Sequence, residues 1–188
     1  MGTIFLAVTG TQGSGKSVFT DIAKRKYKIP TYRLGNIIFD ECKKRGLEIN
    51  GRNIAKMAAA LRYEEGDQAI AGKAIPAIKE LIQNNPKMLL IDGIRSFSEL
   101  ALLRAEFGEI KLVAIISSLK VRKERVEARK RIDHESEGDF QEREQRELGF
   151  GLGDAITKAD HYILNDGILK SEFISKIEEL LERIMDNK

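Results

Sequence analysis

Short apolar runs alternate along this chain with longer segments in which apolar residues recur every three or four positions. Runs of the first kind are typical of strands, and the spacing of the second kind predicts amphipathic helices. The expected strands are residues 4–9, 29–33, 87–92, 112–116 and 161–164. Strands that alternate with helices predict an α/β fold, in which a mostly parallel sheet is covered by helices on both faces.

The segments between these strands predict the covering helices. Ser96 or Ser98 would cap one of them, because a serine hydroxyl can accept a hydrogen bond from the first helical turn. Pro76 lies inside another and predicts a kink or a break, since proline lacks a backbone donor. The first expected helix begins near residue 16, and the next three span residues 36–45, 52–64 and 67–84. The serine-capped helix ends at residue 107, another begins at residue 119, and the last has an apolar face over residues 173–184.

The first strand runs into a glycine-rich segment that matches the P-loop pattern G-x-x-x-x-G-K-[ST] at every constrained position. Its residues are Gly10, Thr11, Gln12, Gly13, Ser14, Gly15, Lys16 and Ser17. Glycines let the chain wrap tightly, so that several backbone N–H groups converge on one phosphate. The Lys16 ammonium would reach the β- and γ-phosphate oxygens, and the Ser17 hydroxyl would bind Mg²⁺. The segment predicts a site for the phosphates of a nucleoside triphosphate.

Asp92 and Arg95 follow the apolar run 87–92, at the end of a strand where open α/β sheets bind their ligands. A carboxylate at this position can hold Mg²⁺ directly or through a water molecule, and capping of the next helix is the structural alternative. The planar guanidinium of Arg95 could bind the phosphate of an acceptor, or form an ordinary surface ion pair.

Basic and acidic residues are segregated in the last third of the chain. Seven basic residues fall between positions 120 and 131, and seven acidic residues fall between 133 and 147. We interpret the acidic stretch as a solvated insertion after a basic helix. Arginines that a closing segment brings to a transferring phosphoryl group are expected catalysts, and a solvated face is the alternative for each. The candidates that flank the insertion are Arg129, Arg131, Arg143 and Arg146.

Composition narrows the class of protein. The 188 residues suffice for one α/β domain, and no apolar run approaches the roughly 18 residues that a membrane span requires. The beginning of the chain has no basic region before its apolar run, so we expect a cytoplasmic protein without a secretory signal. Cys42 is the single cysteine, which fits a reducing compartment. A net charge of +3 does not indicate DNA binding.

The order of these parts resembles that of the P-loop nucleoside monophosphate kinase superfamily, which includes adenylate kinases and dephospho-CoA kinases. The resemblance extends over nearly the whole chain, and it is closer to archaeal-type proteins related to adenylate kinase. Besides the P-loop, the resemblance rests on DGIRS at residues 92–96, REQREL at 143–148, FGLG at 150–153 and ADHYILNDG at 159–167.

This resemblance implies a P-loop three-layer sandwich with a five-stranded parallel sheet over residues 1–188. It also implies a helical acceptor-binding segment at residues 35–65, which would include Gly35 and Asn36, and a lid at residues 130–146. The loop of Asn165, Asp166 and Gly167 would lie beside the adenine of ATP. Arg125 and Arg129 would lie near the donor phosphates, which adds Arg125 to the catalytic candidates Lys16, Arg129 and Arg143.

The segment that would bind the acceptor departs from the adenylate kinase pattern. Those enzymes have Thr-Gly-Asp at this point and an arginine three residues after the aspartate. Here Asn36 follows Gly35, and Phe39 takes the place of the arginine. Dephospho-CoA kinases place an acidic residue after the second strand, and residues 32–36 contain none.

The leading hypothesis is a phosphotransferase that uses ATP and Mg²⁺ and acts on a small acceptor, with a nucleoside monophosphate such as AMP favoured. An ATPase that uses water is a second hypothesis. A third is an ATP-dependent switch or assembly factor with a protein or RNA partner. The long helical stretch between the second and third strands favours a kinase, while Asn36 and Phe39 favour the alternatives. The sequence leaves the oligomeric state open.

Overall fold

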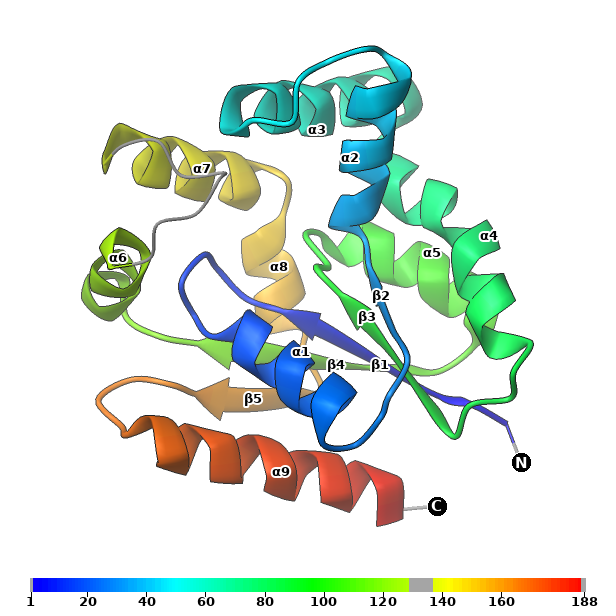
Figure 1. The fold of residues 1–188 in the computed structure, drawn as a ribbon, viewed down its shortest axis with the longest axis vertical. Helices are drawn as coiled ribbons and strands as arrows, with labels where there is room; N and C mark the ends of the chain where they lie inside the picture. Colours follow the sequence, from blue (N-terminus) through cyan, green and yellow to red (C-terminus); the bar gives the residue numbers. More distant parts are fainter. Residues whose placement is uncertain (1, 129–136, 187–188) are drawn as a thin grey trace.

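Five parallel strands form the central sheet of the computed structural model, which describes residues 2–128 and 137–186 (Figure 1). The strands are β1 (Ile4–Thr9), β2 (Thr31–Arg33), β3 (Met88–Asp92), β4 (Ile110–Ile116) and β5 (His161–Leu164). Their order across the sheet is β2-β3-β1-β4-β5. All five expected strands are present, and the predicted five-stranded parallel sheet is confirmed.

The register of the sheet places the chemically important strand ends side by side. β1 lies between β3 and β4, with Val8 opposite Asp92 and Thr9 opposite Ala114. Because the strands are parallel, the segments that follow β1 and β3 emerge at the same edge of the sheet. The P-loop and Asp92 therefore meet there, although they are far apart in the sequence.

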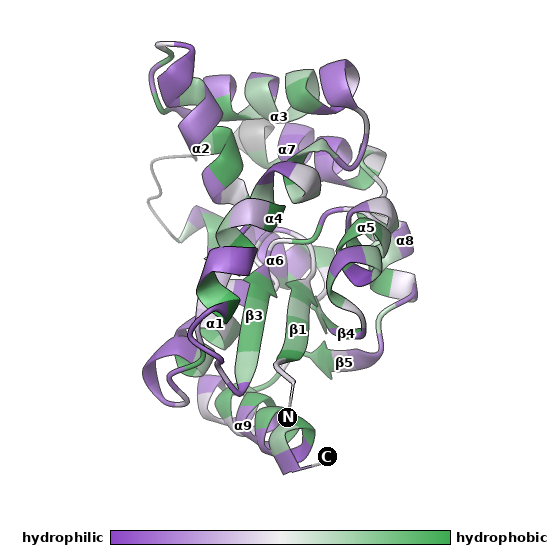
Figure 2. Ribbon diagram, turned by 90° about the vertical axis from the view of Figure 1, so that its right-hand side faces the viewer, coloured by the Kyte–Doolittle hydropathy of each residue, from purple (hydrophilic) through white to green (hydrophobic). Residues whose placement is uncertain are grey.

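Nine helices surround the sheet in the part of the chain that the structure describes. They are α1 (Lys16–Arg25), α2 (Gly35–Lys44), α3 (Gly51–Glu65), α4 (Ala69–Ile82), α5 (Phe97–Phe107), α6 (Leu119–Glu127), α7 (Glu137–Gly149), α8 (Leu152–Thr157) and α9 (Lys170–Asp186). Figure 2 shows hydrophobic strands at the centre and helices with mixed surfaces around them. Each expected helix is present, within a few residues of its predicted bounds.

Two hydrophobic clusters pack on opposite faces of the sheet. In β1, Leu6 and Val8 contact one cluster while Phe5 and Ala7 contact the other, as the two-residue period of a strand requires. One cluster is completed by buried residues of α1 and α9, and the other by residues of α2, α3, α4, α5 and α8. Burial on both faces is the reason that the strands have continuous apolar sequences.

Single residues of the sequence also gave predictions about individual helices, and these had different outcomes. The Ser96 hydroxyl accepts a hydrogen bond from the backbone N–H of Glu99 at 3.1 Å, so Ser96 is the cap of α5. Cys42 is buried within α2. Of the kink or break predicted at Pro76, the break is excluded, because α4 continues on both sides of Pro76 with Ala74 and Ile78 buried in the core. The kink stays a prediction. Within residues 2–128 and 137–186, no helix has the length and apolar content needed to cross a membrane.

Candidate active site

The P-loop turns between β1 and α1 with glycines in conformations that other residues rarely adopt. Gly15 has a φ of 116°, and α1 begins at the next residue, Lys16. A Cβ atom on Gly15 would lie 2.6 Å from the side-chain nitrogen of Asn165. Both the backbone angle and the close approach require glycine at this position.

Asn165 ties the loop after β5 to the P-loop. Its Nδ2 donates to the backbone oxygen of Ser14 at 2.7 Å, and its backbone N–H donates to Ile116 O at 2.7 Å. Asp166 accepts hydrogen bonds from the backbone N–H and the hydroxyl of Ser118, at 3.1 and 2.8 Å. These hydrogen bonds to Ser118 lower the pKa of Asp166. The predicted Asn165-Asp166-Gly167 loop therefore lies beside the phosphate-binding segment.

Arg125 also contacts this loop. Its guanidinium donates to the backbone oxygen of Asn165 at 3.1 Å and to Asn165 Oδ1 at 3.2 Å. A third bond reaches the Ser117 hydroxyl at 3.2 Å. Arg125 is thus placed to support the loop beside the P-loop, and its catalytic role stays a prediction.

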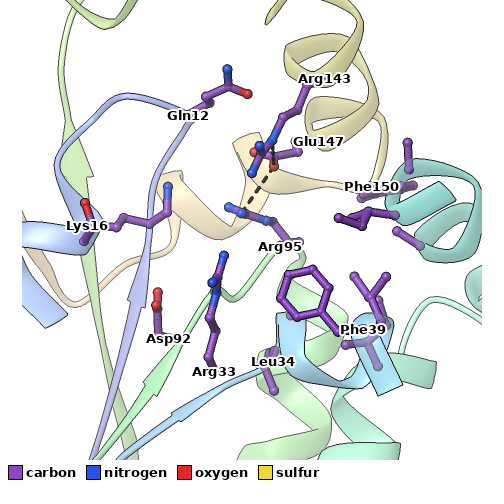
Figure 3. Close-up of a pocket in the computed structure, with 18 of the residues that line it drawn as sticks. Gln12, Lys16, Arg33, Leu34, Phe39, Asp92, Arg95, Arg143, Glu147 and Phe150 are labelled. Atoms are coloured by element: carbon purple, nitrogen blue, oxygen red, sulfur yellow. Dashed lines mark hydrogen bonds and ion pairs between the residues drawn. The ribbon is translucent and has the colours of Figure 1, made fainter. Parts of the chain in front are cut away.

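A cavity of about 780 Å³ opens between the P-loop, the ends of β2 and β3, and helices α2, α3 and α7. Figure 3 shows Lys16, Arg33, Arg95 and Arg143 approaching its centre from different elements. Among the predicted site residues, those that line the cavity are Gln12, Gly13, Gly15, Lys16, Ser17, Gly35, Asp92, Arg95, Arg143 and Arg146. The cavity thus joins the donor residues to the segment predicted to bind the acceptor.

Lys16 is held by the P-loop itself. Its ammonium contacts the backbone oxygen of Gly10 and donates to Thr11 O at 2.9 Å. Burial, together with the nearby charge of Arg95, lowers the pKa of Lys16 to about 7. An arriving phosphate would offer oxygens that replace these carbonyl groups and favour the charged ammonium.

Arg95 and Arg143 share one carboxylate, that of Glu147 on α7. Glu147 Oε1 lies 3.2 Å from Arg95 Nη2 and accepts a hydrogen bond from Arg143 Nε at 3.1 Å (Figure 3). Burial opposes ionisation of Glu147, but Arg95, Arg143 and Lys16 outweigh it and lower its pKa to about 2. Three cations and one carboxylate therefore meet at the wall of the cavity.

Ser17 and Asp92, the predicted Mg²⁺ ligands, line the same cavity. The described residues contain no group of three or more His, Cys, Asp or Glu side chains that could hold a metal by themselves. This arrangement fits Mg²⁺, which protein sites often bind through one or two side chains together with phosphate oxygens and water. A hydroxyl and a carboxylate beside the P-loop are suitable ligands of this kind.

The acidic stretch is not simply a solvated insertion, which corrects the sequence interpretation. On α7, Phe140 and Glu147 are buried, and both Glu144 oxygens accept hydrogen bonds from Arg122 at 2.7 Å. Arg122 is itself buried and also donates to Gln12 O at 3.2 Å. Opposite charges on α6 and α7 hold the two helices together, because each neutralises the other away from water.

Some predictions fall outside the described residues. Arg129, Arg131 and residues 130–136 of the predicted lid belong to this group. In contrast, Asn36 lies on the exposed side of α2 and does not line the cavity. The helical turn of α2 directs Leu34 and Ile38 inward instead, so the side chain at position 36 faces away from the predicted acceptor.

Sequence reasoning missed Arg33 and Arg62, which line the cavity on the acceptor side. The Arg33 guanidinium lies 5.7 Å from the ring centroid of Phe39. Arg62 is buried, pairs with Glu99 Oε1 at 2.6 Å and stacks on Phe150 at 4.1 Å from the ring centroid. Arg33 could have been found from the sequence, because it lies at the end of the predicted second strand. Arg62 could not, because its contacts with Glu99 and Phe150 join segments that are distant in the sequence.

The sequence matches a known family and its relatives. A family model described as an AAA domain matches residues 6–148. A protein of Thermococcus onnurineus, named UPF0200 protein, is 39% identical over 186 residues, which cover 97% of this chain and 98% of the relative.

Two solved structures share the fold. The protein TT1252 from Thermus thermophilus has a TM-score of 0.70 at 14% identity, over 98% of this chain and 99% of its own. Shikimate kinase from Bacteroides thetaiotaomicron has a TM-score of 0.59 at 16% identity, over 95% of this chain and 98% of its own. The fold of this chain is therefore the fold of these two proteins.

Proposed function

This chain belongs to the UPF0200 family, and we propose that it is a phosphotransferase that moves the γ-phosphate of ATP to a small acceptor. AMP is the acceptor that we test first, because the sequence resembles nucleoside monophosphate kinases. The proposal includes Mg²⁺ as the cofactor and a cytoplasmic location, where ATP is available.

The observation that carries this proposal is the continuity of the cavity. It extends from Lys16 and Ser17 at the P-loop to Ile38 and Ile54 on the helices α2 and α3. A protein that only hydrolyses ATP needs access for water, whereas transfer to a second molecule needs a space of this kind beside the γ-phosphate. The helical segment supplies that space.

The residues of this chain would act mainly by position and charge. Lys16 and the backbone of the P-loop would bind the donor phosphates, while Arg95 and Arg143 would face the group in transfer. An oxygen of the acceptor would form a bond to the γ-phosphorus as the bond to the β–γ bridging oxygen breaks, leaving ADP. A phosphate oxygen of AMP would attack in its deprotonated form, so that step releases no proton, whereas a hydroxyl acceptor would lose its proton to solvent. Ser17 and Asp92 would hold Mg²⁺, which when bound neutralises charge on the phosphate oxygens.

The exposed position of Asn36, and Phe39 in place of an arginine, favour a second candidate. In that case water would be the acceptor, and ATP hydrolysis would drive a switch that acts on a protein or RNA partner. Arg33 favours the kinase hypothesis, because it supplies a cation at the mouth of the cavity on the acceptor side.

Formation of ADP from Mg·ATP separates these functions when it is measured alone and with AMP, CMP, GMP, UMP or dephospho-CoA. The kinase predicts that one acceptor increases turnover and appears as a phosphorylated product of matching amount. Turnover that no acceptor increases, with release of inorganic phosphate, would contradict it and support the ATPase. The variant Lys16→Ala is the control, and it should lose turnover in either case.

A further inference from the structure

Glu147 is a buried carboxylate that pairs with two of the cations that would bind phosphate, and it reaches them from outside the P-loop. It stands on α7, whereas Arg95 follows β3 and Lys16 begins α1. Its side chain is 8% exposed and lines the cavity. A buried carboxylate is unfavourable in a site that binds polyanions, because like charges repel strongly where water is excluded. Its presence there therefore requires an explanation.

The two oxygens of Glu147 are used unequally. Oε1 alone contacts both Arg95 and Arg143, at 3.2 and 3.1 Å. Oε2 is buried and has no hydrogen-bond partner among the described residues. The carboxylate therefore shares one oxygen between two guanidinium groups and leaves its other oxygen buried without a donor from the described part of the chain.

A phosphate group would be a better partner for these cations. It offers three terminal oxygens and more negative charge than a carboxylate, and it can accept two parallel hydrogen bonds from each arginine. Lys16, which now contacts the loop oxygens of Gly10 and Thr11, would gain a charged partner in the same exchange.

We propose that Glu147 is an internal counter-anion that occupies the phosphate position in the free protein and is displaced from Arg95 and Arg143 when polyphosphate binds. It is a positioning residue, because it keeps the two arginines in place until the phosphate groups of the substrate form ion pairs with them. The exchange also lowers the affinity for polyphosphate, because the incoming group must break the existing ion pairs. The inference rests on the proposed function only in taking the cavity to bind phosphate.

The test compares wild type, Glu147→Gln and Glu142→Gln for binding of inorganic tripolyphosphate by calorimetry and for the melting temperature with and without it. Glu142 is on the same helix and exposed, so its variant is a control with the same change in charge. We expect Glu147→Gln to bind roughly tenfold more tightly, because a competing charge is gone. It should melt lower than wild type without the anion and show a larger rise in Tm with it.

Equal or weaker binding by Glu147→Gln would overturn the inference, because loss of a merely structural contact would not increase affinity. If the variant does not fold in buffer, millimolar tripolyphosphate should restore folding, and failure to do so would also overturn it. A wild type that does not bind tripolyphosphate would instead contradict the phosphate site and with it the proposed function. A wild type that binds, with no gain in the variant, would contradict only the role of Glu147.

Discussion

The two halves of the cavity are built in different ways. The donor half, residues 10–17 with Asn165, presents backbone groups that a continuous segment holds in place. The acceptor half, formed by Arg33, Arg62 and the apolar residues of α2 and α3, consists of side chains from separate elements. Local chain geometry therefore sets the shape of the donor half, while tertiary packing sets that of the acceptor half. Changes in the two halves should have different consequences.

The largest effect should follow the loss of Arg62, which ties α3 to α5. The side chains of Arg62 and Glu99 are 6% and 1% exposed and lie 2.6 Å apart. Arg62→Ala should lower the free energy of unfolding by about 3–5 kcal/mol, because it leaves the buried Glu99 carboxylate without its ion-pair partner and, among the described residues, with only the backbone N–H of Arg95 as a donor. Denaturant unfolding measures this change.

The matched control is Arg45→Ala, which removes a pair with Glu64 between α2 and α3 at 2.8 Å. These side chains are 41% and 45% exposed, so water solvates the Glu64 carboxylate after Arg45 is removed, and the free energy of unfolding should hardly change. Equal losses in the two variants would refute the claim that burial of the Arg62 pair holds the acceptor half.

Gly15→Ala tests whether the donor half depends on backbone geometry. The added methyl group would clash with Asn165 at a φ of 116°, so we expect a loss of about 2–4 kcal/mol in the free energy of unfolding, together with weaker ATP binding. Gly153→Ala is the control, because Gly153 is within α8 and its Cβ would meet nothing within 4 Å. Stability unchanged in Gly15→Ala would show that the loop can relax.

Arg33→Ala should act on the acceptor alone. We expect the KM of the acceptor to rise roughly tenfold while the KM of ATP changes little, because the variant removes one charged hydrogen-bond donor from the acceptor side. Steady-state kinetics with each substrate varied measures the difference. Asn36→Ala should leave both constants unchanged, since Asn36 faces away from the cavity. The reverse result would restore the acceptor role predicted for Asn36.

The smallest effect concerns protons at Lys16. Because burial and Arg95 lower its pKa to about 7, Lys16 is mostly neutral at pH 8 in the free protein. Polyphosphate favours the ammonium, so binding of Mg·ATP at pH 8 should take up close to one proton, and affinity should fall as pH rises above 7. Calorimetry in buffers of different ionisation enthalpy measures the uptake. Lys16→Arg should bind without it, whereas undiminished uptake in that variant would place the proton elsewhere.

The same shift predicts how stability depends on pH. The unfolded chain holds its proton on Lys16 up to a pKa near 10.5, whereas the folded protein loses it near 7. Between these values the unfolded state binds more protons, so the contribution of Lys16 to stability rises with pH in this window.

Much of the fold could be predicted because its signals are local. The apolar runs identified all five strands, and the two candidate caps Ser96 and Ser98 located the start of α5 to within two residues, with Ser96 the cap in the structure. At Pro76, where a kink or a break was predicted, the helix does not break, because packing of α4 against the core compensates for the loss of one backbone donor. The acidic stretch was misread for a related reason, since a charged sequence looks solvated until its partners are known.

The sequence by itself determined the strands, seven of the nine described helices, the P-loop and the acid that follows β3, because backbone preferences and hydrophobic periodicity act over a few residues. Only the tertiary structure decided which charges meet. Glu147 with Arg95, Glu144 with Arg122, and Arg62 with Glu99 each join separate elements. The physical reason is that an ion pair depends on a distance of a few ångströms and on the exclusion of water, and packing of distant segments sets both.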